Sequence, residues 1–301
     1  AEYFTGTEKS VLVIPAPYGF EVDRVVLIGI GNEKQRNEIS FLNLGGVIAK
    51  SVSKGGKTTI LLIGTEDWKL DGKAAAELAL GIQLRCYKFD RYKSRKSDQE
   101  KPVKGGLHVK ISSHYTDQAR EAYVHASAVA NGVNLARDLV NEPANVLTPE
   151  AFAKKAASLS KLGVSIEILD EKQLEKIGMR ALLAVGQGSR RQSHVVIMRW
   201  HGVKGVKNKK SKPLVFIGKG VCFDTGGISI KPAGNMEDMK GDMAGAACVV
   251  GLMHTLAARQ AHVDAVGIIG LVENMPDGNA QRPGDIIKSV SYTHLTLPTI
   301  L

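Results

Sequence analysis

The sequence predicts an α/β protein of two domains, in which each domain is a mostly parallel or mixed sheet flanked by helices. Short apolar runs of strand length alternate along the chain with longer amphipathic segments, and this alternation is typical of sheets covered by helices. A length of 301 residues is enough for two domains, each with its own core. The content of 44% hydrophobic and 23% charged residues is that of a globular protein.

The first domain is predicted to span residues 1–116. Its elements are strands over residues 10–15, 24–30, 58–64 and 106–113, and helices over residues 41–53 and 73–84. Gly29 and Gly31 end the second of these strands in a loop. They do not indicate a dinucleotide site, because a third glycine in register and a following acidic residue are missing.

The second domain is predicted to span residues 117–289 and to begin with a long helix over residues 117–139. Thr148 is a good N-cap and Pro149 suits the first turn, so a further helix is expected to reach Leu162. The elements expected after it are strands over residues 164–169, 194–201, 214–217 and 263–272, a short helix over 171–177 that ends at Gly178, and a helix that starts after Asp242.

One stretch of this domain, residues 213–245, is expected to carry its chemistry. A buried central strand over residues 214–217 is followed by a glycine-rich loop that holds Lys219, Asp224 and Lys231, and then by the helix from Asp242. Open α/β sheets bind their ligands at such a junction of strand, loop and helix. Two carboxylates and two lysines indicate a site for a hard divalent cation with a spare positive charge beside it.

Several motifs resemble the signatures of the leucyl aminopeptidases, also called cytosol aminopeptidases. They are residues 218–232 (GKGVCFDTGGISIKP), 136–149 (ARDLVNEPANVLTP), 184–189 (AVGQGS), 273–276 (ENMP) and 282–285 (RPGD). The resemblance extends over most of the chain. It implies a two-metal-dependent aminopeptidase that releases N-terminal residues, of the leucine type, from peptides through a metal-activated water.

The resemblance also implies a role for each polar residue of the 213–245 stretch. Asp224 bridges two divalent ions, which are Mn²⁺ or Zn²⁺ with Mg²⁺ as a further candidate, and Lys219 and Asp242 bind the second ion. Lys231 is catalytic: as an ammonium it would stabilise the oxyanion of the tetrahedral intermediate. Taken singly, each residue has an ordinary structural interpretation, but four matched positions in one signature favour the functional one. We expect the four side chains to meet in one pocket at the carboxyl edge of the sheet.

The sequence departs from the family after Ser289. The family continues into an NTDAEGR segment, which supplies another metal-binding aspartate and a glutamate, and this segment is absent. Residues 290–301 resemble a translated sequencing adapter, so we expect a non-native tail without fixed packing, in which His294 is no ligand. The resemblance therefore implies a fragment that also lacks upstream residues. Its catalytic domain would be incomplete and inactive, with an unpaired sheet edge and exposed apolar surface.

Charge and cysteine content bear on partners and location. A net charge of +10 suits an anionic partner, and a DNA-binding accessory protein is the alternative function, because some members of the family bind DNA. The lysines, however, gather in two loops, residues 93–104 and 204–212, where few aromatic residues occur, which favours solvated loops. Three cysteines without paired spacing indicate reduced thiols in a cytoplasmic protein. No membrane partner is expected, because no apolar run is expected to approach the length of a membrane span. The resemblance implies a homo-hexamer.

Overall fold

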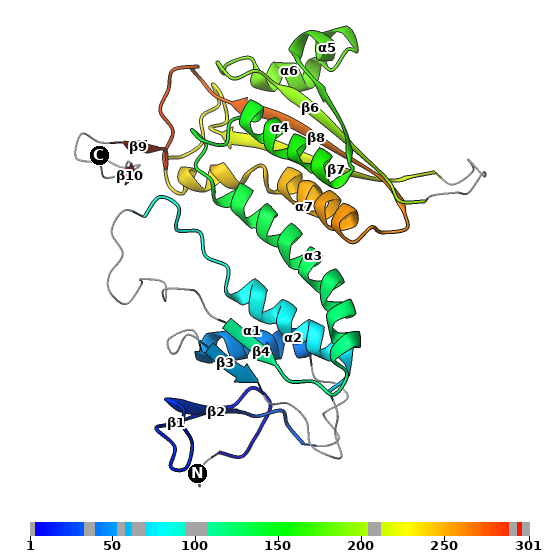
Figure 1. The fold of residues 1–301 in the computed structure, drawn as a ribbon. Coiled ribbons are helices and arrows are strands. Elements are labelled where there is room, and N and C mark those ends of the chain that lie inside the picture. Colours follow the sequence, from blue (N-terminus) through cyan, green and yellow to red (C-terminus); the bar gives the residue numbers. More distant parts are fainter. Residues whose placement is uncertain are drawn as a thin grey trace. The chain divides into compact units, whose positions relative to one another are not determined.

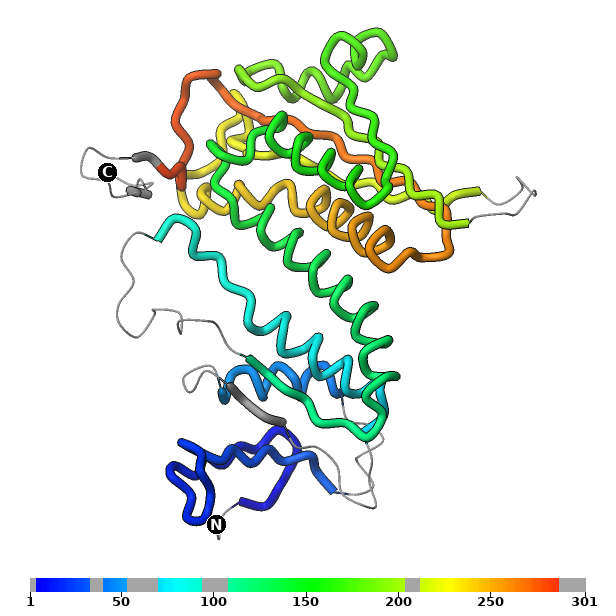
Figure 2. The backbone as a smooth tube through the Cα atoms, in the orientation of Figure 1, coloured from blue at the N-terminus to red at the C-terminus, as the bar shows by residue number. Residues whose placement is uncertain are grey.

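The computed structural model describes residues 4–32, 40–52, 58–61, 70–93, 108–203, 212–288 and 294–296. Two compact units divide the chain: Ala1–Lys88 with Lys96–Ala130, and Phe89–Arg95 with Asn131–Leu301. Helices and strands follow one another through both units, as Figures 1 and 2 show along the colour gradient. The predicted α/β class is therefore confirmed.

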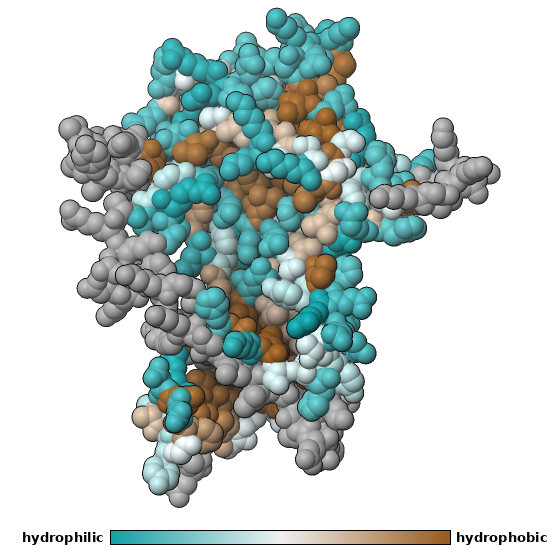
Figure 3. Space-filling view, in the orientation of Figure 1, coloured by the Kyte–Doolittle hydropathy of each residue, from teal (hydrophilic) through white to brown (hydrophobic). Residues whose placement is uncertain are grey.

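The first unit contains two small sheets and two helices. β1 (Val11–Pro15) pairs antiparallel with β2 (Arg24–Ile28), and β3 (Thr58–Leu61) pairs parallel with β4 (His108–Ile111). The strands of the first pair carry half-exposed apolar side chains, which form part of the brown surface over this hairpin in Figure 3. Among the described residues, the four strands expected here thus form two separate pairs.

Helices α1 (Phe41–Val52) and α2 (Gly72–Arg85) pack against each other through glycine in the first unit. A β-carbon on Gly45 would lie only 2.3 Å from the carbonyl oxygen of Leu78, and one on Gly81 would lie 2.0 Å from that of Leu42. No side chain fits at such distances, so the two backbones approach closely because both positions are glycine. Around this contact the side chains of Leu44, Ile48, Leu78 and Ile82 form the core.

The second unit is built on a four-stranded mixed sheet. Helix α3 (Thr116–Asn141) begins in the first unit and ends in the second. The elements that follow are α4 (Pro149–Ala157), the 3₁₀ helix η2 (Ser158–Leu162), β5 (Ser165–Leu169), α5 (Glu171–Lys176), α6 (Arg180–Gly186), β6 (His194–His201), β7 (Leu214–Asp224), η3 (Met236–Gly241), α7 (Ala244–Ala258), β8 (Asp264–Asn274), β9 (Ile286–Lys288) and β10 (His294–Thr296). The strand order is β5-β6-β8-β7, and the β7–β8 pair is the parallel one.

The two faces of this sheet are covered differently. Helices α4 and α7 place Phe152 and Val250 in one core with Met198 and Ile269 of the sheet, and Figure 1 shows both helices beside it. On the other face a side chain of α6 lies against Gly270. Within the described part of the chain, β7 pairs with β8 alone, and its Val215 and Ile217 side chains are exposed. The expectation of an open edge with apolar surface is confirmed for these residues.

Three local predictions were wrong. The loop expected after Ile217 is instead a continuation of β7 to Asp224, because main-chain pairing with β8 needs no side chain and Gly218 fits against α7. No helix was expected over residues 180–186, where the structure has α6, which includes the first part of the motif at residues 184–189. Residues 294–296, expected to lie in a tail without fixed packing, form β10, which pairs antiparallel with β9.

The chain contains one described segment, Met236–Ala258, that is long and apolar enough to cross a membrane by length and composition. This corrects the expectation that no run approaches such a length. Half of the segment's apolar window is buried within the protein, and the side chains of α7 that face β7 and β8 belong to the core. Both observations are typical of a helix that packs in the core of a domain.

A buried ionic network holds the loops that follow β8. Glu273 accepts from Arg282 Nε at 2.6 Å and from the Ser189 hydroxyl, and Arg282 Nη1 donates to Asp285 at 3.0 Å. Burial lowers the pKa of Arg282, but the hydrogen bonds and charges of Glu273 and Asp285 outweigh burial and raise the pKa above its usual value. The network ties the loops at residues 189 and 282–285 to the carboxyl end of β8.

The neighbouring glycines of α1 provide a test of the helix contact in the first unit. Gly45→Ala should lower the free energy of unfolding by about 1–3 kcal/mol, the usual cost of overpacking. Gly46→Ala is the control: nothing lies within 4 Å of a β-carbon there, so it should raise stability by about 0.5–1 kcal/mol. Urea denaturation measures both; equal effects would contradict the close approach of the helices.

Arg282→Leu should lower the free energy of unfolding by about 3–5 kcal/mol, because it leaves the buried Glu273 carboxylate without a cation. Arg199→Leu is the matched control, since Arg199 pairs with Glu167 at 2.8 Å on the exposed side of the same unit. Loss of this exposed pair should lower the free energy of unfolding by no more than about 1 kcal/mol. A similar cost for both variants in urea denaturation would show that the network contributes nothing beyond a surface pair.

Candidate functional site

The candidate site lies where β7 and β8 end side by side. Parallel strands bring their carboxyl ends to the same sheet edge, and the register places Asp224 of β7 opposite Asn274 of β8. A register shift between Val221 and Asp224 interrupts the regular pairing just before this point. Such a bulge changes the direction of the side chains that follow it. The strand therefore delivers Asp224 to the edge from which its loop departs.

Three donors surround the carboxylate of Asp224. Its Oδ1 accepts from the main-chain nitrogen of Gly226 at 2.9 Å and from Asn274 Nδ2 at 2.8 Å, and its Oδ2 accepts from Lys231 Nζ at 2.7 Å. Lys231 reaches back to the strand because its main-chain nitrogen donates to the Thr225 carbonyl at 2.9 Å. The turn between them uses Gly226 at φ 87°, where a β-carbon would lie 2.4 Å from the Ser229 carbonyl oxygen.

The charge state of Asp224 follows from these contacts. Burial raises the pKa of its carboxyl group, but the hydrogen bonds from Lys231, Gly226 and Asn274 and the charge of Lys231 act in the opposite direction. The net effect lowers the pKa below its ordinary value. Asp224 is therefore an anion at neutral pH, as a ligand for a hard cation must be.

A second pair joins β7 to the start of α7. Lys219 Nζ lies 2.6 Å from Asp242 Oδ1, and the Lys219 backbone is so close to the helix that a β-carbon on Gly245 would lie 3.1 Å from its nitrogen. Asp242 follows η3 directly and precedes the first turn of α7. Its second oxygen, Oδ2, is buried and has no hydrogen-bond partner within the described part of the protein. A buried carboxylate oxygen without a donor is costly and suits a site that a cation can complete.

The structure places the four predicted residues in two ion pairs, Lys231 with Asp224 and Lys219 with Asp242. That all four share one pocket stays a prediction. The described residues contain no group of three or more histidine, cysteine, aspartate or glutamate side chains placed to hold a metal ion. The chemistry of two carboxylates and a lysine amine still suits a hard dication. The unpartnered Oδ2 of Asp242 is positioned to bind one. They are part of a ligand set rather than a full one.

Sequence reasoning did not single out Asn274. Residues 273–276 were noted only as a motif of the family, whereas Asn274 ends β8 and bonds directly to the Asp224 carboxylate. The signal that could have found it is its place: it is the last residue of the strand parallel to β7. Adjacent side chains on a strand point to opposite faces, so Glu273 faces the ionic network while Asn274 faces the site.

The motif at residues 136–149 has a structural role in this unit. Glu142 is buried and accepts from Arg91 and from the Tyr92 hydroxyl, whose pKa rises to about 12 through burial and the neighbouring carboxylate. Asn145 exchanges hydrogen bonds with the main chain of Ile286 through its side chain, at 2.8 and 3.3 Å. These contacts give Glu142 and Asn145 a structural role.

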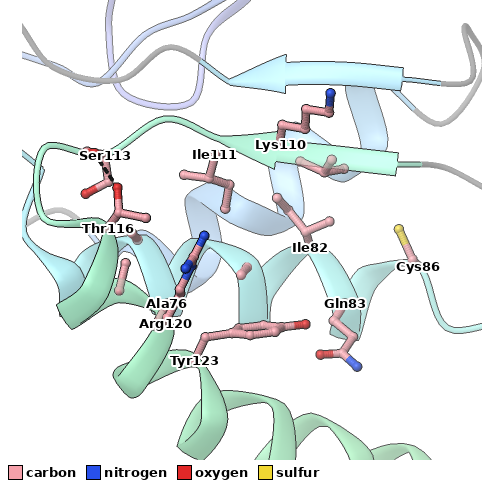
Figure 4. Close-up of a pocket in the computed structure, with 14 residues that line it drawn as sticks. Ala76, Ile82, Gln83, Cys86, Lys110, Ile111, Ser113, Thr116, Arg120 and Tyr123 are labelled. Atoms are coloured by element: carbon pink, nitrogen blue, oxygen red, sulfur yellow. Dashed lines mark hydrogen bonds between the residues drawn. The ribbon is translucent and has the colours of Figure 1, made fainter.

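A pocket of about 740 Å³ lies in the first unit, among α2, β4 and the first turns of α3. Figure 4 shows Ile82 and Ile111 lining it together with the polar side chains of Arg120, Tyr123 and Cys86. None of the predicted site residues contributes to it. Burial raises the pKa of the Cys86 thiol, so this cysteine is not an activated nucleophile.

Comparison with known proteins identifies relatives of the whole chain. Residues 1–96 match the model of the cytosol aminopeptidase family N-terminal domain, and residues 134–297 match that of its catalytic domain. The second match therefore includes residues 290–297, which we had expected to be foreign. The chain is 52% identical over 291 residues to a probable cytosol aminopeptidase of Bradyrhizobium sp. (strain BTAi1 / ATCC BAA-1182), and 53% identical over 293 residues to one of Rhizobium meliloti (strain 1021).

These alignments cover 97% and 96% of the chain but 57% of each relative, so the chain spans little more than half of their length. Two solved structures are also similar. The bottromycin maturation enzyme BotP in complex with Mn has a TM-score of 0.75 at 29% identity, over 97% of this chain and 60% of that one. The cytosol aminopeptidase from Coxiella burnetii has a TM-score of 0.69 at 25% identity, over 98% and 57%. By both of its family matches, the chain belongs to the cytosol aminopeptidase family.

Proposed function

We propose that the full-length protein is a metal-dependent aminopeptidase that releases N-terminal residues, of the leucine type, from peptides. The observation that carries this proposal is the pair of carboxylate–lysine contacts at the carboxyl end of β7, Asp224 with Lys231 and Asp242 with Lys219. Membership of the cytosol aminopeptidase family supports the reaction class. The site residues themselves remain a proposal from their chemistry and their motif.

Asp224, Asp242 and Lys219 would hold two divalent ions together with ligands from outside the described residues. Manganese and zinc are the proposed metals, and the structural similarity to BotP, which was solved in complex with Mn, supports the first. When bound, such ions lower the pKa of a water molecule enough to make it a nucleophile near neutral pH. To act as a ligand, Lys219 must lose its proton, which adjacent dications favour.

Lys231 is proposed to keep its proton and act on the substrate. Its ammonium group lies 2.7 Å from Asp224 Oδ2, and the short turn through Gly226 anchors its backbone near Asp224, so the side chain can leave the carboxylate and still lie beside the reacting centre. A fixed positive charge there stabilises the oxyanion that forms when the peptide carbonyl is attacked. In this structure the ammonium groups of the two lysines pair with the two carboxylates.

Location and assembly are proposed on the same family basis. We propose a cytoplasmic protein, supported by the three cysteines Cys86, Cys222 and Cys248, all of them free thiols. A homo-hexamer is proposed for the full-length protein. A secondary role in DNA binding is favoured by the net charge of +10 and would appear as salt-sensitive retention on duplex DNA.

In the full-length enzyme, Lys231→Ala should lower kcat by about two to three orders of magnitude with metal content unchanged, the scale of losing one oxyanion-stabilising group. Asp224→Ala should lose metal and activity together. Hydrolysis of a leucine amide and metal analysis of the purified variants measure both effects. Loss of metal from Lys231→Ala would show that the proposed division of roles is wrong.

The 301-residue chain by itself should have negligible aminopeptidase activity and weak metal affinity. Lys219, Asp224 and Asp242 are too few protein ligands to hold two hydrated dications tightly, since the NTDAEGR segment is absent from the sequence. The purified chain is assayed with excess manganese or zinc and a leucine amide substrate. Robust turnover that Asp224→Ala abolishes would show the missing segment to be dispensable.

A further inference from the structure

We infer that Asn274 is a positioning residue for Asp224, fixing which carboxylate oxygen is offered to a cation. The inference rests on the proposed function, in which Asp224 is a metal ligand. Asn274 Nδ2 donates to Asp224 Oδ1 at 2.8 Å, from the strand that pairs in parallel with that of Asp224. An amide is suited to this task because it donates a hydrogen bond without adding charge and does not titrate near neutral pH.

The main chain of Asn274 is anchored to the same loop. Its carbonyl oxygen accepts from the main-chain nitrogen of Thr225 at 3.0 Å and from the Thr225 hydroxyl at 2.9 Å. On the other side of the amide, Oδ1 lies so near Gly227 that a β-carbon there would be 3.0 Å away. The side chain is therefore confined between the strand end and the turn, and its amide has little freedom to turn away from Asp224.

These contacts make the two oxygens of Asp224 unequal. Oδ1 accepts from two fixed donors, Asn274 Nδ2 and the Gly226 nitrogen, whereas Oδ2 accepts from the flexible side chain of Lys231. The Lys231 side chain is 38% exposed, so moving it costs little desolvation. Oδ2 is thus the oxygen from which an ammonium can give way to a metal ion. Partners that orient a ligand in this way typically contribute about 10- to 100-fold in metal affinity.

A purely structural role is the alternative, since Asn274 also ties β8 to the turn after β7. The two roles can be distinguished, because a structural role affects the fold and a positioning role affects metal binding. The carbonyl contacts with Thr225 hold the backbone and survive any side-chain substitution, whereas the Nδ2 contact touches the carboxylate alone. Removing the amide group should therefore weaken metal binding more than it weakens the fold.

The test is a titration of the full-length protein with Mn²⁺, in which the electron paramagnetic resonance signal reports the free ion. Asn274→Leu keeps the size of the side chain and removes the donor, and Asn274→Ser is a second variant if the first does not fold. Each should weaken Mn²⁺ binding about tenfold. The control is Asn279→Leu, the same change at an exposed position of the loop after β8, which should leave the affinity unchanged. Circular dichroism checks the fold of each variant.

Asp224→Asn separates this inference from the proposed function. If Asp224→Asn weakens Mn²⁺ binding but both Asn274 variants bind as the parent chain does, Asp224 is a ligand and the positioning role is wrong. If Asp224→Asn also binds as the full-length parent protein does, or that parent protein binds no Mn²⁺, the metal site itself is wrong and the inference falls with it. A loss in Asn279→Leu equal to that in Asn274→Leu would mean a general effect of the loop and would also overturn the inference.

Discussion

The parallel pairing of β7 with β8 is the constraint on which the candidate site depends. It brings two strand ends to the same edge and sets Asp224 opposite Asn274. Helix α7 lies very close to β7: a β-carbon on Gly218 would sit 2.6 Å from the Cα of Ala246. With a larger residue at this position the helix would stand further off, and Asp242 at its start would lose contact with Lys219. Backbone packing in the core thus determines which charges meet at the surface.

The second unit contains buried and exposed ion pairs, and the degree of burial decides how much each contributes to stability. Arg282 and Glu273 are almost fully buried, so breaking that pair leaves an isolated charge in a medium that solvates it poorly. The side chains of Lys219 and Lys231 are 62% and 38% exposed, and pairs of this kind contribute little to stability. The buried pair therefore holds the scaffold. The exposed lysines can leave their carboxylates at small cost, as the proposed metal site requires.

The adjacent residues Glu273 and Asn274 connect the buried ionic network to the candidate site. The alternation of side chains along β8 directs the first toward the buried network and the second toward Asp224. Any displacement of the strand end would disturb both sets of contacts together. The position of the Asp224 carboxylate is therefore coupled to the packing of the 282–285 loop through the backbone of β8.

The sequence by itself determined the α/β class, most of the longer helices and strands and the family, and it yielded the proposal of Lys219, Asp224, Lys231 and Asp242 as site residues. Apolar periodicity, capping residues and a long motif are local properties, and they are legible without coordinates. Tertiary structure alone decided that β7 continues through its glycines to Asp224, that Lys219 pairs with Asp242 and Lys231 with Asp224, and that Asn274 is a partner of Asp224. The local sequence around Gly218 and Gly220 does not predict a strand, and the sequence around Asn274 does not predict a contact with Asp224. Their roles arise from strand pairing and helix packing between distant segments, which periodicity along the chain does not encode.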